Sequence, residues 1–216
     1  MVSGSLDGTI QIWRIDTGKC ARIINLSVGV ISVKVFSSGY RIICGLNSVS
    51  NNMRIYNYST GSLLNTLYGH LNNVNSIDIL NEHIIISGGG DQKVIIWDLL
   101  TYKIKYHLTD HKESVNCVKR LSSNLVASGD SGGKIIIWNW LKGQRMYELN
   151  GHTSELWLSS LDLFDSQTLI SGSLDRTIKF WNIKNGTLIK TINVDIQVNA
   201  LAMTSEGFLY FIFKEK

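Results

Sequence analysis

Short hydrophobic runs, several of them ending in or spanning an aromatic residue, recur along this chain. "KVIIWDL" (Lys93–Leu99) and "KIIIWNW" (Lys134–Trp140) are rich in β-branched residues and lack the 3.6-residue spacing of a helix. Similar runs precede the first of them at Val74–Leu80 and His83–Ser87, and another follows a later aromatic residue at Thr187–Ile192. The pattern predicts short β-strands along the whole chain.

Turn residues separate these runs at regular places. A residue pair ending in glycine follows the aromatic strand at Thr17-Gly18, Thr60-Gly61, Lys142-Gly143 and Asn185-Gly186. Such pairs between two strand-like runs are typical of β-hairpins. We therefore expect consecutive strands to pair antiparallel.

One eleven-residue phrase occurs twice, nearly unchanged. "SGSLDGTIQIW" ends at Trp13 and "SGSLDRTIKFW" ends at Trp181, and related phrases end at Tyr56, Trp97 and Trp138. These five aromatic anchors are separated by 43, 41, 41 and 43 positions. A period held over five copies indicates a repeat architecture. Four short strands in about forty residues are typical of a propeller blade.

The repeats resemble those of the WD-repeat β-propeller family. The shared dipeptides are "GH" at Gly69-His70 and Gly151-His152, "DH" at Asp110-His111, "WD" at Trp97-Asp98, and "WN" at Trp138-Asn139 and Trp181-Asn182. The resemblance implies an all-β propeller of four-stranded antiparallel blades with about five repeats. It implies a single domain over residues 1–216, in which 193–216 begin a further, incomplete repeat.

Histidine, serine, aspartate and tryptophan recur at fixed offsets within the repeats. The two complete sets are His70, Ser87, Asp91 and Trp97, and His152, Ser171, Asp175 and Trp181. A Ser-His-Asp hydrolase is one interpretation. However, an enzyme needs one such site, and the Trp N–H has no catalytic role. The resemblance implies instead a structural tetrad that satisfies buried polar groups, and we expect no catalytic residue.

Other repeats depart from this pattern. The partial tetrads are Ser3, Asp7 and Trp13 in the first repeat, and His111, Ser128 and Trp138 in the fourth. In the fourth repeat Gly132 occupies the expected aspartate position and Asp130 stands two positions earlier, which predicts an incomplete network. The second repeat has Asn25-Leu26 in place of "GH" and two extra turn residues, so no tetrad is expected there.

Both ends of the sequence interrupt a repeat. Met1-Val2 lead directly into Ser3-Gly4, and the strand-like runs Gln197–Met203 and Phe208–Phe213 are not followed by another phrase. One interpretation is a ring of five blades closed by strands from both termini. The other, which we favour, is a fragment of a longer propeller. An open arc would have free strand edges, which promote self-association.

The composition limits which classes of binding partner and which cellular compartment we expect. The formal net charge is +4 without a Lys/Arg run, which favours neither nucleic acid nor a membrane surface as a partner. No apolar run is long enough to span a membrane. Cys20, Cys44 and Cys117 have neither the number nor the spacing of a disulfide framework or zinc site. We expect reduced thiols, an intracellular (cytoplasmic or nuclear) protein, and no metal or cofactor.

The resemblance implies a rigid platform for protein–protein interaction, and we expect a non-catalytic scaffold or adaptor. The candidate partner-binding positions on the loop face are Asn73, Asn75, Ser114, Asn116, Glu155, Trp157 and Leu174. Trp157 stands out because its counterparts are Asn75 and Asn116, so packing does not require an indole there. The alternative for Trp157 is that it fills the channel or contacts a neighbouring blade.

Two other functions remain open at this point. A propeller hydrolase would need one polar cluster that is not repeated. A phosphoinositide- or phospho-motif-binding propeller would need paired arginines on a rim, whereas the seven arginines are dispersed in the sequence.

Overall fold

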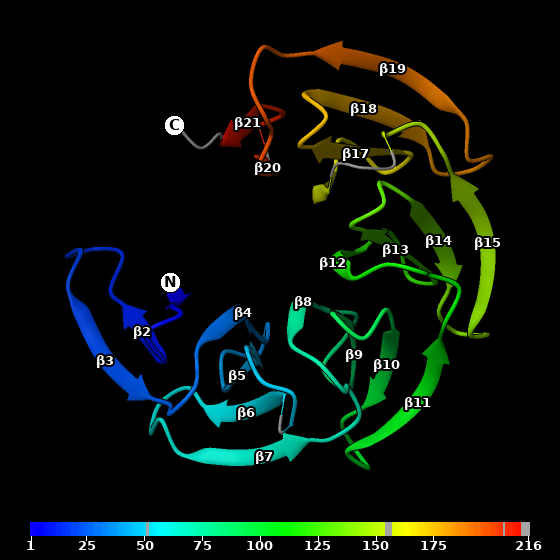
Figure 1. Cartoon of the computed structure of the whole chain (residues 1–216). Helices are drawn as coiled ribbons and strands as arrows, with labels where there is room; N and C mark the ends of the chain where they lie inside the picture. The colour runs from blue at the N-terminus through cyan, green and yellow to red at the C-terminus, as the bar shows by residue number, and fades with distance from the viewer. Residues whose placement is uncertain (51, 154–156, 205, 213–216) are drawn as a thin grey trace. The chain divides into compact units, whose positions relative to one another are not determined.

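The computed structural model describes residues 1–50, 52–153, 157–204 and 206–212. In these residues the chain forms the short strands β1 to β21 and no helix (Figure 1). The expected all-β architecture is therefore confirmed. Within each sheet, strands that are consecutive in the sequence are neighbours, and the hairpins pair antiparallel, as the turns predicted.

The strands form six sheets, numbered I to VI here in chain order. Sheet I contains β1 (Val2–Gly4), β2 (Thr9–Trp13) and β3 (Cys20–Asn25). Sheet II contains β4 (Val30–Val35), β5 (Arg41–Leu46), β6 (Met53–Asn57) and β7 (Leu63–Leu67). Sheet III contains β8 (Val74–Ile79), β9 (Ile84–Gly89), β10 (Val94–Asp98) and β11 (Lys103–Leu108).

The remaining strands make up the second half of the chain. Sheet IV contains β12 (Val115–Arg120), β13 (Leu125–Asp130), β14 (Ile135–Asn139) and β15 (Gln144–Leu149). Sheet V contains β16 (Leu158–Leu163), β17 (Thr168–Ser173), β18 (Thr177–Asn182) and β19 (Leu188–Asn193). Sheet VI contains β20 (Ala200–Met203) and β21 (Leu209–Ile212). Of the run expected at Phe208–Phe213, the last residue lies outside the described residues.

The chain divides into two compact units. The first comprises Met1–Asp91 and Ile95–Tyr106, and the second comprises Gln92–Val94 and His107–Lys216. Sheets I and II and nearly all of sheet III belong to the first unit. Sheets IV, V and VI belong to the second.

The same irregularities recur in successive sheets. Between the last two strands of sheets I, II, IV and V the register shifts at the anchor aromatic, namely at Trp13, Tyr56, Trp138 and Trp181. A β-bulge of this kind changes the direction of a side chain and increases local twist. The hairpin turn that follows has glycine at a φ of 65° to 74° in sheets I, II, IV and V, and Tyr102 at 55° in sheet III.

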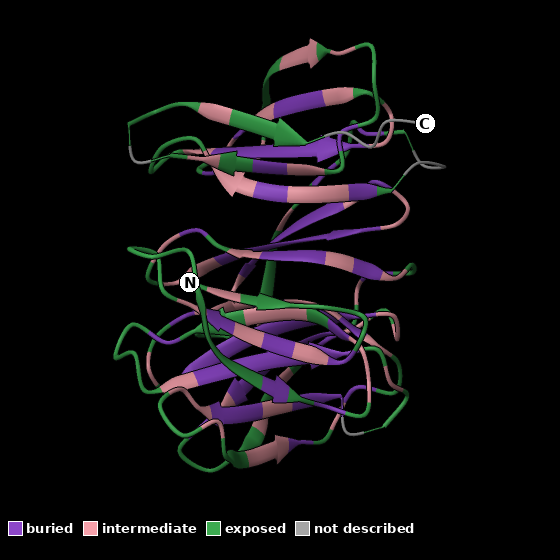
Figure 2. Ribbon diagram, turned by 90° about the vertical axis from the view of Figure 1, so that its left-hand side faces the viewer, coloured by how far each residue is buried: buried purple, intermediate pink, exposed green. Residues whose placement is uncertain are grey.

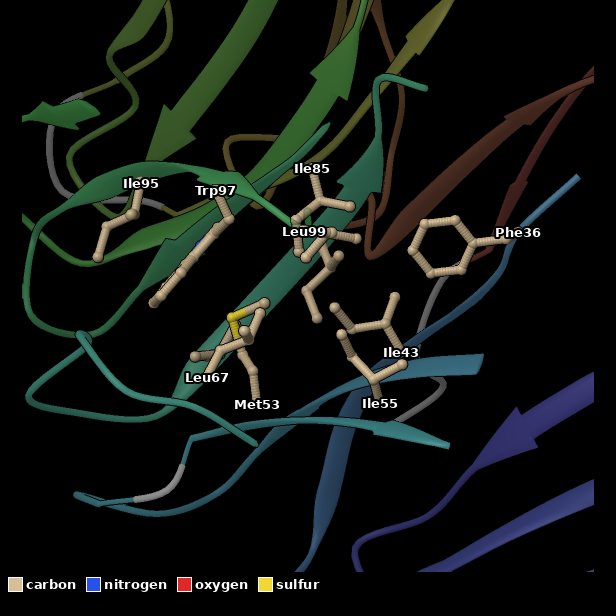
Figure 3. Packing of buried hydrophobic residues seen from close by; sticks show 11 residues of the cluster. Phe36, Ile43, Met53, Ile55, Leu67, Ile85, Ile95, Trp97 and Leu99 are labelled. Carbon is tan, nitrogen blue, oxygen red and sulfur yellow. The ribbon is translucent and has the colours of Figure 1, made fainter. Parts of the chain in front are cut away.

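Hydrophobic residues from two sheets interlock to form the core of the first unit. Ile85, Ile95, Trp97 and Leu99 of sheet III face Met53, Ile55, Leu67 and Phe36 of sheet II (Figure 3). Ile95 and Leu99 flank Trp97 at i±2, so all three side chains project from the same face of the chain. Trp97 is 1% exposed.

The second unit repeats this arrangement. Trp181 and Ile183 of sheet V pack with Ile135, Ile137 and Leu149 of sheet IV. Figure 2 shows the same distribution along the ribbon, with buried residues concentrated on the strands and exposed residues in the turns. Within each unit, neighbouring sheets therefore bury hydrophobic faces against each other, as expected when a repeat cannot bury its faces alone.

Candidate functional site

The residues of the two complete sets lie together in the structure. In sheet III, the Trp97 indole Nε1–H donates to Ser87 Oγ at 2.8 Å, and Ser87 Oγ is 2.8 Å from His70 Nε2. His70 Nδ1 is 2.8 Å from Asp91 Oδ1. The other Asp91 carboxylate oxygen accepts from the backbone N–H of Leu71 at 3.0 Å. The network thus joins strands β9 and β10 to the turn between them and to the segment before β8.

Sheet V has the same geometry. Trp181 Nε1–H donates to Ser171 Oγ at 2.8 Å, His152 Nε2 is 2.7 Å from Ser171 Oγ, and His152 Nδ1 is 2.8 Å from Asp175 Oδ2. Thr177 Oγ1 adds contacts to Asp175 Oδ1 at 2.6 Å and to His152 Nδ1 at 3.1 Å.

Two pKa values in the sheet V network are shifted. Burial lowers the pKa of His152, although its hydrogen bond to Asp175 acts in the opposite direction. Burial tends to raise the pKa of Asp175, but hydrogen bonds from Thr177 and His152 outweigh it and lower that pKa. Both shifts favour a neutral imidazole beside a charged carboxylate.

The network in sheet IV is complete, contrary to the expectation from the sequence. Trp138 Nε1–H donates to Ser128 Oγ, and His111 Nε2 lies 2.7 Å from the same Oγ. The carboxylate comes from Asp130, whose Oδ2 is 2.7 Å from His111 Nδ1. Asp130 is the last residue of β13 and lies two positions before Gly132. Its Oδ1 also accepts from the N–H groups of Gly132 and Lys134, so one carboxylate both closes the turn and orients the histidine.

The first two repeats lack this network. In sheet I, Trp13 Nε1–H donates to Ser3 Oγ at 2.8 Å, while Asp7 accepts from the N–H and hydroxyl of Thr9. In sheet II, Leu26, Cys44 and Tyr56 occupy the histidine, serine and tryptophan positions and belong to one hydrophobic cluster. These residues supply neither the imidazole nor the indole of a tetrad.

The tetrads are poorly suited to catalysis. Ser87, Ser128 and Ser171 are each 0% exposed, so a substrate carbonyl has no access to Oγ. Each Oγ also accepts a hydrogen bond from an indole N–H, which lowers its nucleophilicity. Within the described part of the chain, no group of three or more His, Cys, Asp or Glu residues could hold a metal ion.

Most candidate partner-binding residues hold the loops together. Asn73 Nδ2–H donates to Asn75 Oδ1, and the Asn73 carbonyl accepts from Gly90 N–H. Asn116 Nδ2–H donates to Ser131 Oγ at 3.3 Å and to the Leu158 carbonyl at 3.4 Å. The Ser114 carbonyl accepts from Ser131 N–H at 2.9 Å. All four of the candidates in these contacts are half-buried.

Trp157 differs from these residues because its side chain is 60% exposed. Its backbone is nevertheless fixed, since its carbonyl accepts from Ser173 Oγ–H and from Leu174 N–H, both at 3.1 Å. The half-buried Leu174 therefore lies beside Trp157 on the same loop surface. Glu155 lies outside the described residues.

Comparison with known proteins agrees with the fold. The family described as "WD domain, G-beta repeat" matches residues 61–98, 102–139 and 143–182, which is more than half of the chain. These segments cover strands of sheets II to V. The chain belongs to the WD-repeat family.

Individual relatives are distant. "Autophagy-related protein 16" of Arabidopsis thaliana is 24% identical over 160 residues, which cover 74% of this chain and 23% of that protein. "Protein tipD" of Dictyostelium discoideum is 29% identical over 100 residues (46% and 16%). "Ribosome biogenesis protein YTM1" of Saccharomyces cerevisiae is 29% identical over 113 residues (50% and 24%). The chain spans about a quarter or less of the length of these relatives.

WD-repeat proteins are commonly scaffolds, and their repeats are usually non-catalytic. In the described residues, no helix has the length and apolar character needed to cross a membrane.

Proposed function

We propose that this chain is a non-catalytic scaffold that binds protein partners through a loop surface centred on Trp157. The observation that carries the proposal is that Trp157 combines a hydrogen-bonded backbone with an exposed indole. The Trp157 carbonyl holds two hydrogen bonds, while 60% of the residue stays exposed. An aromatic side chain on a fixed backbone adds contact area at low entropic cost, which is typical of binding hot spots.

The counterpart positions support this choice. Asn75 and Asn116 are half-buried, and Asn116 bonds across to the carbonyl of Leu158. Trp157 makes no such side-chain hydrogen bond to a neighbouring sheet among the described residues. The alternative interpretation, in which the indole fills a channel or packs against a neighbour, is disfavoured by its exposure.

The thiols fit an intracellular setting, which is part of the proposal. Cys20, Cys44 and Cys117 are all free, and Cys44 and Cys117 are buried. Burial raises the pKa of Cys44 to about 12 and also raises that of Cys117, so neither is a reactive thiolate. Unpaired thiols are typical of a reducing compartment.

The test is affinity capture of cellular proteins with the wild type and with Trp157→Ala, followed by mass spectrometry. The matched control is Tyr40→Ala, which removes an aromatic side chain that is 71% exposed in the turn between β4 and β5. We expect Trp157→Ala to lose most partners and Tyr40→Ala to keep them, with thermal unfolding unchanged in both. Equal capture by all three proteins would show that this surface is not the binding site.

A further inference from the structure

Two arginines that are apart in the sequence line one cavity. The cavity has a volume of about 260 Å³ and is bordered by Arg14 and Arg22 of sheet I and by Tyr58 and Ser59 of sheet II. Arg14 also lines an adjoining cavity of about 370 Å³, together with Lys19. The two arginines, dispersed in the sequence, therefore line one cavity where the turn between β2 and β3 of sheet I lies beside the turn between β6 and β7 of sheet II.

In the described part of the chain, no carboxylate forms an ion pair with these cations. Carboxylate ion pairs form instead at Lys34, Arg41, Lys119, Lys134 and Arg145. None of them includes Arg14, Lys19 or Arg22, although Asp16 lies between the first two in the sequence. The cavity therefore has a net positive charge that is open to solvent, and this is the electrostatic condition for binding an anion.

Arg22 is held in place by the neighbouring sheet. Its Nη1–H donates to the Thr60 carbonyl at 3.0 Å. Its side chain also crosses Gly61, where an added Cβ would lie 3.2 Å from Arg22 Cδ. The bond to Thr60 uses one donor and leaves the other guanidinium N–H groups for a ligand. A guanidinium fixed before binding loses less entropy when the ligand arrives.

We propose that Arg14 and Arg22 form a binding site for a phosphate monoester, presented as a phosphorylated side chain on an extended segment of a protein partner. A guanidinium group binds two phosphate oxygens in a bidentate geometry, and two guanidinium groups together neutralise the charge of a phosphate dianion. Tyr58 and Ser59, which also line the cavity, carry hydroxyl groups of the kind that donate hydrogen bonds to phosphate oxygens. This site is separate from the Trp157 surface and does not depend on it.

The position of the cavity beside a sheet edge favours a phosphorylated side chain on an extended peptide. The outermost strand of sheet I, β3, has a free edge in its sheet. An extended peptide could pair with such an edge.

The experiment measures fluorescence anisotropy of a labelled heptapeptide of alternating alanine and valine with a central phosphoserine. The other two probes are the unphosphorylated peptide of the same sequence and vesicles that contain an anionic phosphoinositide. The variants are Arg14→Ala, Arg14→Ala/Arg22→Ala and Arg14→Lys/Arg22→Lys. The control is Lys142→Ala/Lys184→Ala, which removes the same charge from exposed hairpin turns of sheets IV and V. Because no described contact holds the Arg14 guanidinium, Arg14→Ala should fold normally.

We expect the phosphopeptide to bind at least about tenfold more tightly than the unphosphorylated peptide. Inorganic phosphate should displace the bound phosphopeptide. Each alanine substitution should weaken binding about tenfold, as expected for a charged hydrogen bond. The double lysine variant should bind the phosphopeptide less tightly than the wild type does, because an ammonium group cannot form the bidentate contact. The Lys142→Ala/Lys184→Ala control should bind it with wild-type affinity. Equal binding of both peptides, wild-type affinity in the double alanine variant, or binding to vesicles alone would overturn the proposal.

Discussion

Sheet II and sheet V fill the same three buried positions with different kinds of side chain, apolar ones in sheet II and hydrogen-bonded polar ones in sheet V. In sheet V, Trp181, Ser171 and His152 are buried and joined by hydrogen bonds of 2.7 and 2.8 Å that end on Asp175. In sheet II, the corresponding positions hold Tyr56, Cys44 and Leu26, which pack in a hydrophobic cluster with residues of sheet I. Both sets of residues are buried, at most 9% exposed, and the side chain of Asp175 is 4% exposed.

The difference shows that the network behaves as a unit. A buried polar group that loses its partner carries the full cost of its desolvation, whereas replacing all partners by apolar groups costs little. Sheet II has exchanged histidine, serine and tryptophan together. Sheet IV has kept all three and obtains its carboxylate from Asp130. Where these positions are buried, as in sheets II to V, the fold therefore has a complete network or none, and mixed states should be unstable. Sheet I keeps the Trp13–Ser3 hydrogen bond without a histidine, but Ser3 is exposed there and can bond to water.

The largest effect is expected from truncating the anchor aromatic. Trp181→Ala should lower the free energy of unfolding by about 3–5 kcal/mol, and Tyr56→Ala should have a similar effect, because both remove a buried ring. The phenylalanine variants separate the two sheets. Trp181→Phe removes the donor to Ser171 and should cost about 1–3 kcal/mol, whereas Tyr56→Phe should cost about 1 kcal/mol or less. Urea unfolding measures both, and equal costs for the two phenylalanine variants would contradict the comparison.

A smaller effect is expected from exchanging the serine and cysteine positions. Ser171→Cys places a weak hydrogen-bonding group between the Trp181 N–H and His152, and should cost about 1–3 kcal/mol. Cys44→Ser buries a hydroxyl among hydrophobic side chains and should cost about 1 kcal/mol, since it can still donate to the Arg54 carbonyl as Cys44 does. Thermal unfolding of the two variants measures the costs. A neutral result for Ser171→Cys would show that the network does not act as a unit.

The smallest effect concerns pH. Because burial lowers the pKa of His152 below its ordinary 6.5, the unfolded chain binds a proton more readily at this residue than the folded chain does. The contribution to stability is present above about pH 6.5 and decreases as the pH falls below it. The lowered pKa of Asp175 acts in the same direction at lower pH, because its stabilising charge is lost as the carboxylate is protonated.

The pH measurement compares urea unfolding of the wild type and His152→Ala at about pH 7 and about pH 5. Stability of the wild type should fall more over this interval than stability of the variant, whose overall stability is lower by about 1–3 kcal/mol. Leu26→Val is the control in sheet II, where no group at this position titrates. Parallel pH profiles of wild type and His152→Ala would show that His152 does not contribute to the pH dependence.

Several features could be read from the sequence because they depend on local spacing. Alternating β-branched residues and glycine turns predicted the strands, and the spacing between anchors predicted four-strand repeats. Strand ends were less accurate, since the run expected from Gln197 is a strand only from Ala200. Hydrogen bonding to the partner strand, which the sequence does not display, decides where a strand begins.

The tetrad residues also divide into those that local spacing predicted and those that it missed. In the sets containing His70 and His152, the offsets from serine to aspartate and tryptophan are identical, because they span one hairpin. The offset from histidine to serine differs, 17 positions in one set and 19 in the other, and the dipeptide "GH" marks the histidine instead. Asp130 was missed as the carboxylate of sheet IV, since it lies inside a strand and two positions before the expected turn residue. The available signal was an aspartate close to the serine, two positions after Ser128, from where its carboxylate reaches both His111 and the turn N–H groups.

The sequence by itself determined the period, the strand pairing and the chemistry of each anchor, because these follow from the order of residues within a repeat. Only the tertiary structure decided which side chains from different repeats meet. It placed Arg22 against the Thr60 carbonyl, 38 positions along the chain, and brought Arg14 and Arg22 to one cavity. It also left Trp157 exposed while Asn116 bonds to the next sheet. The physical reason is that exposure and charge pairing depend on neighbouring sheets, and a period in the sequence carries no information about the space between them.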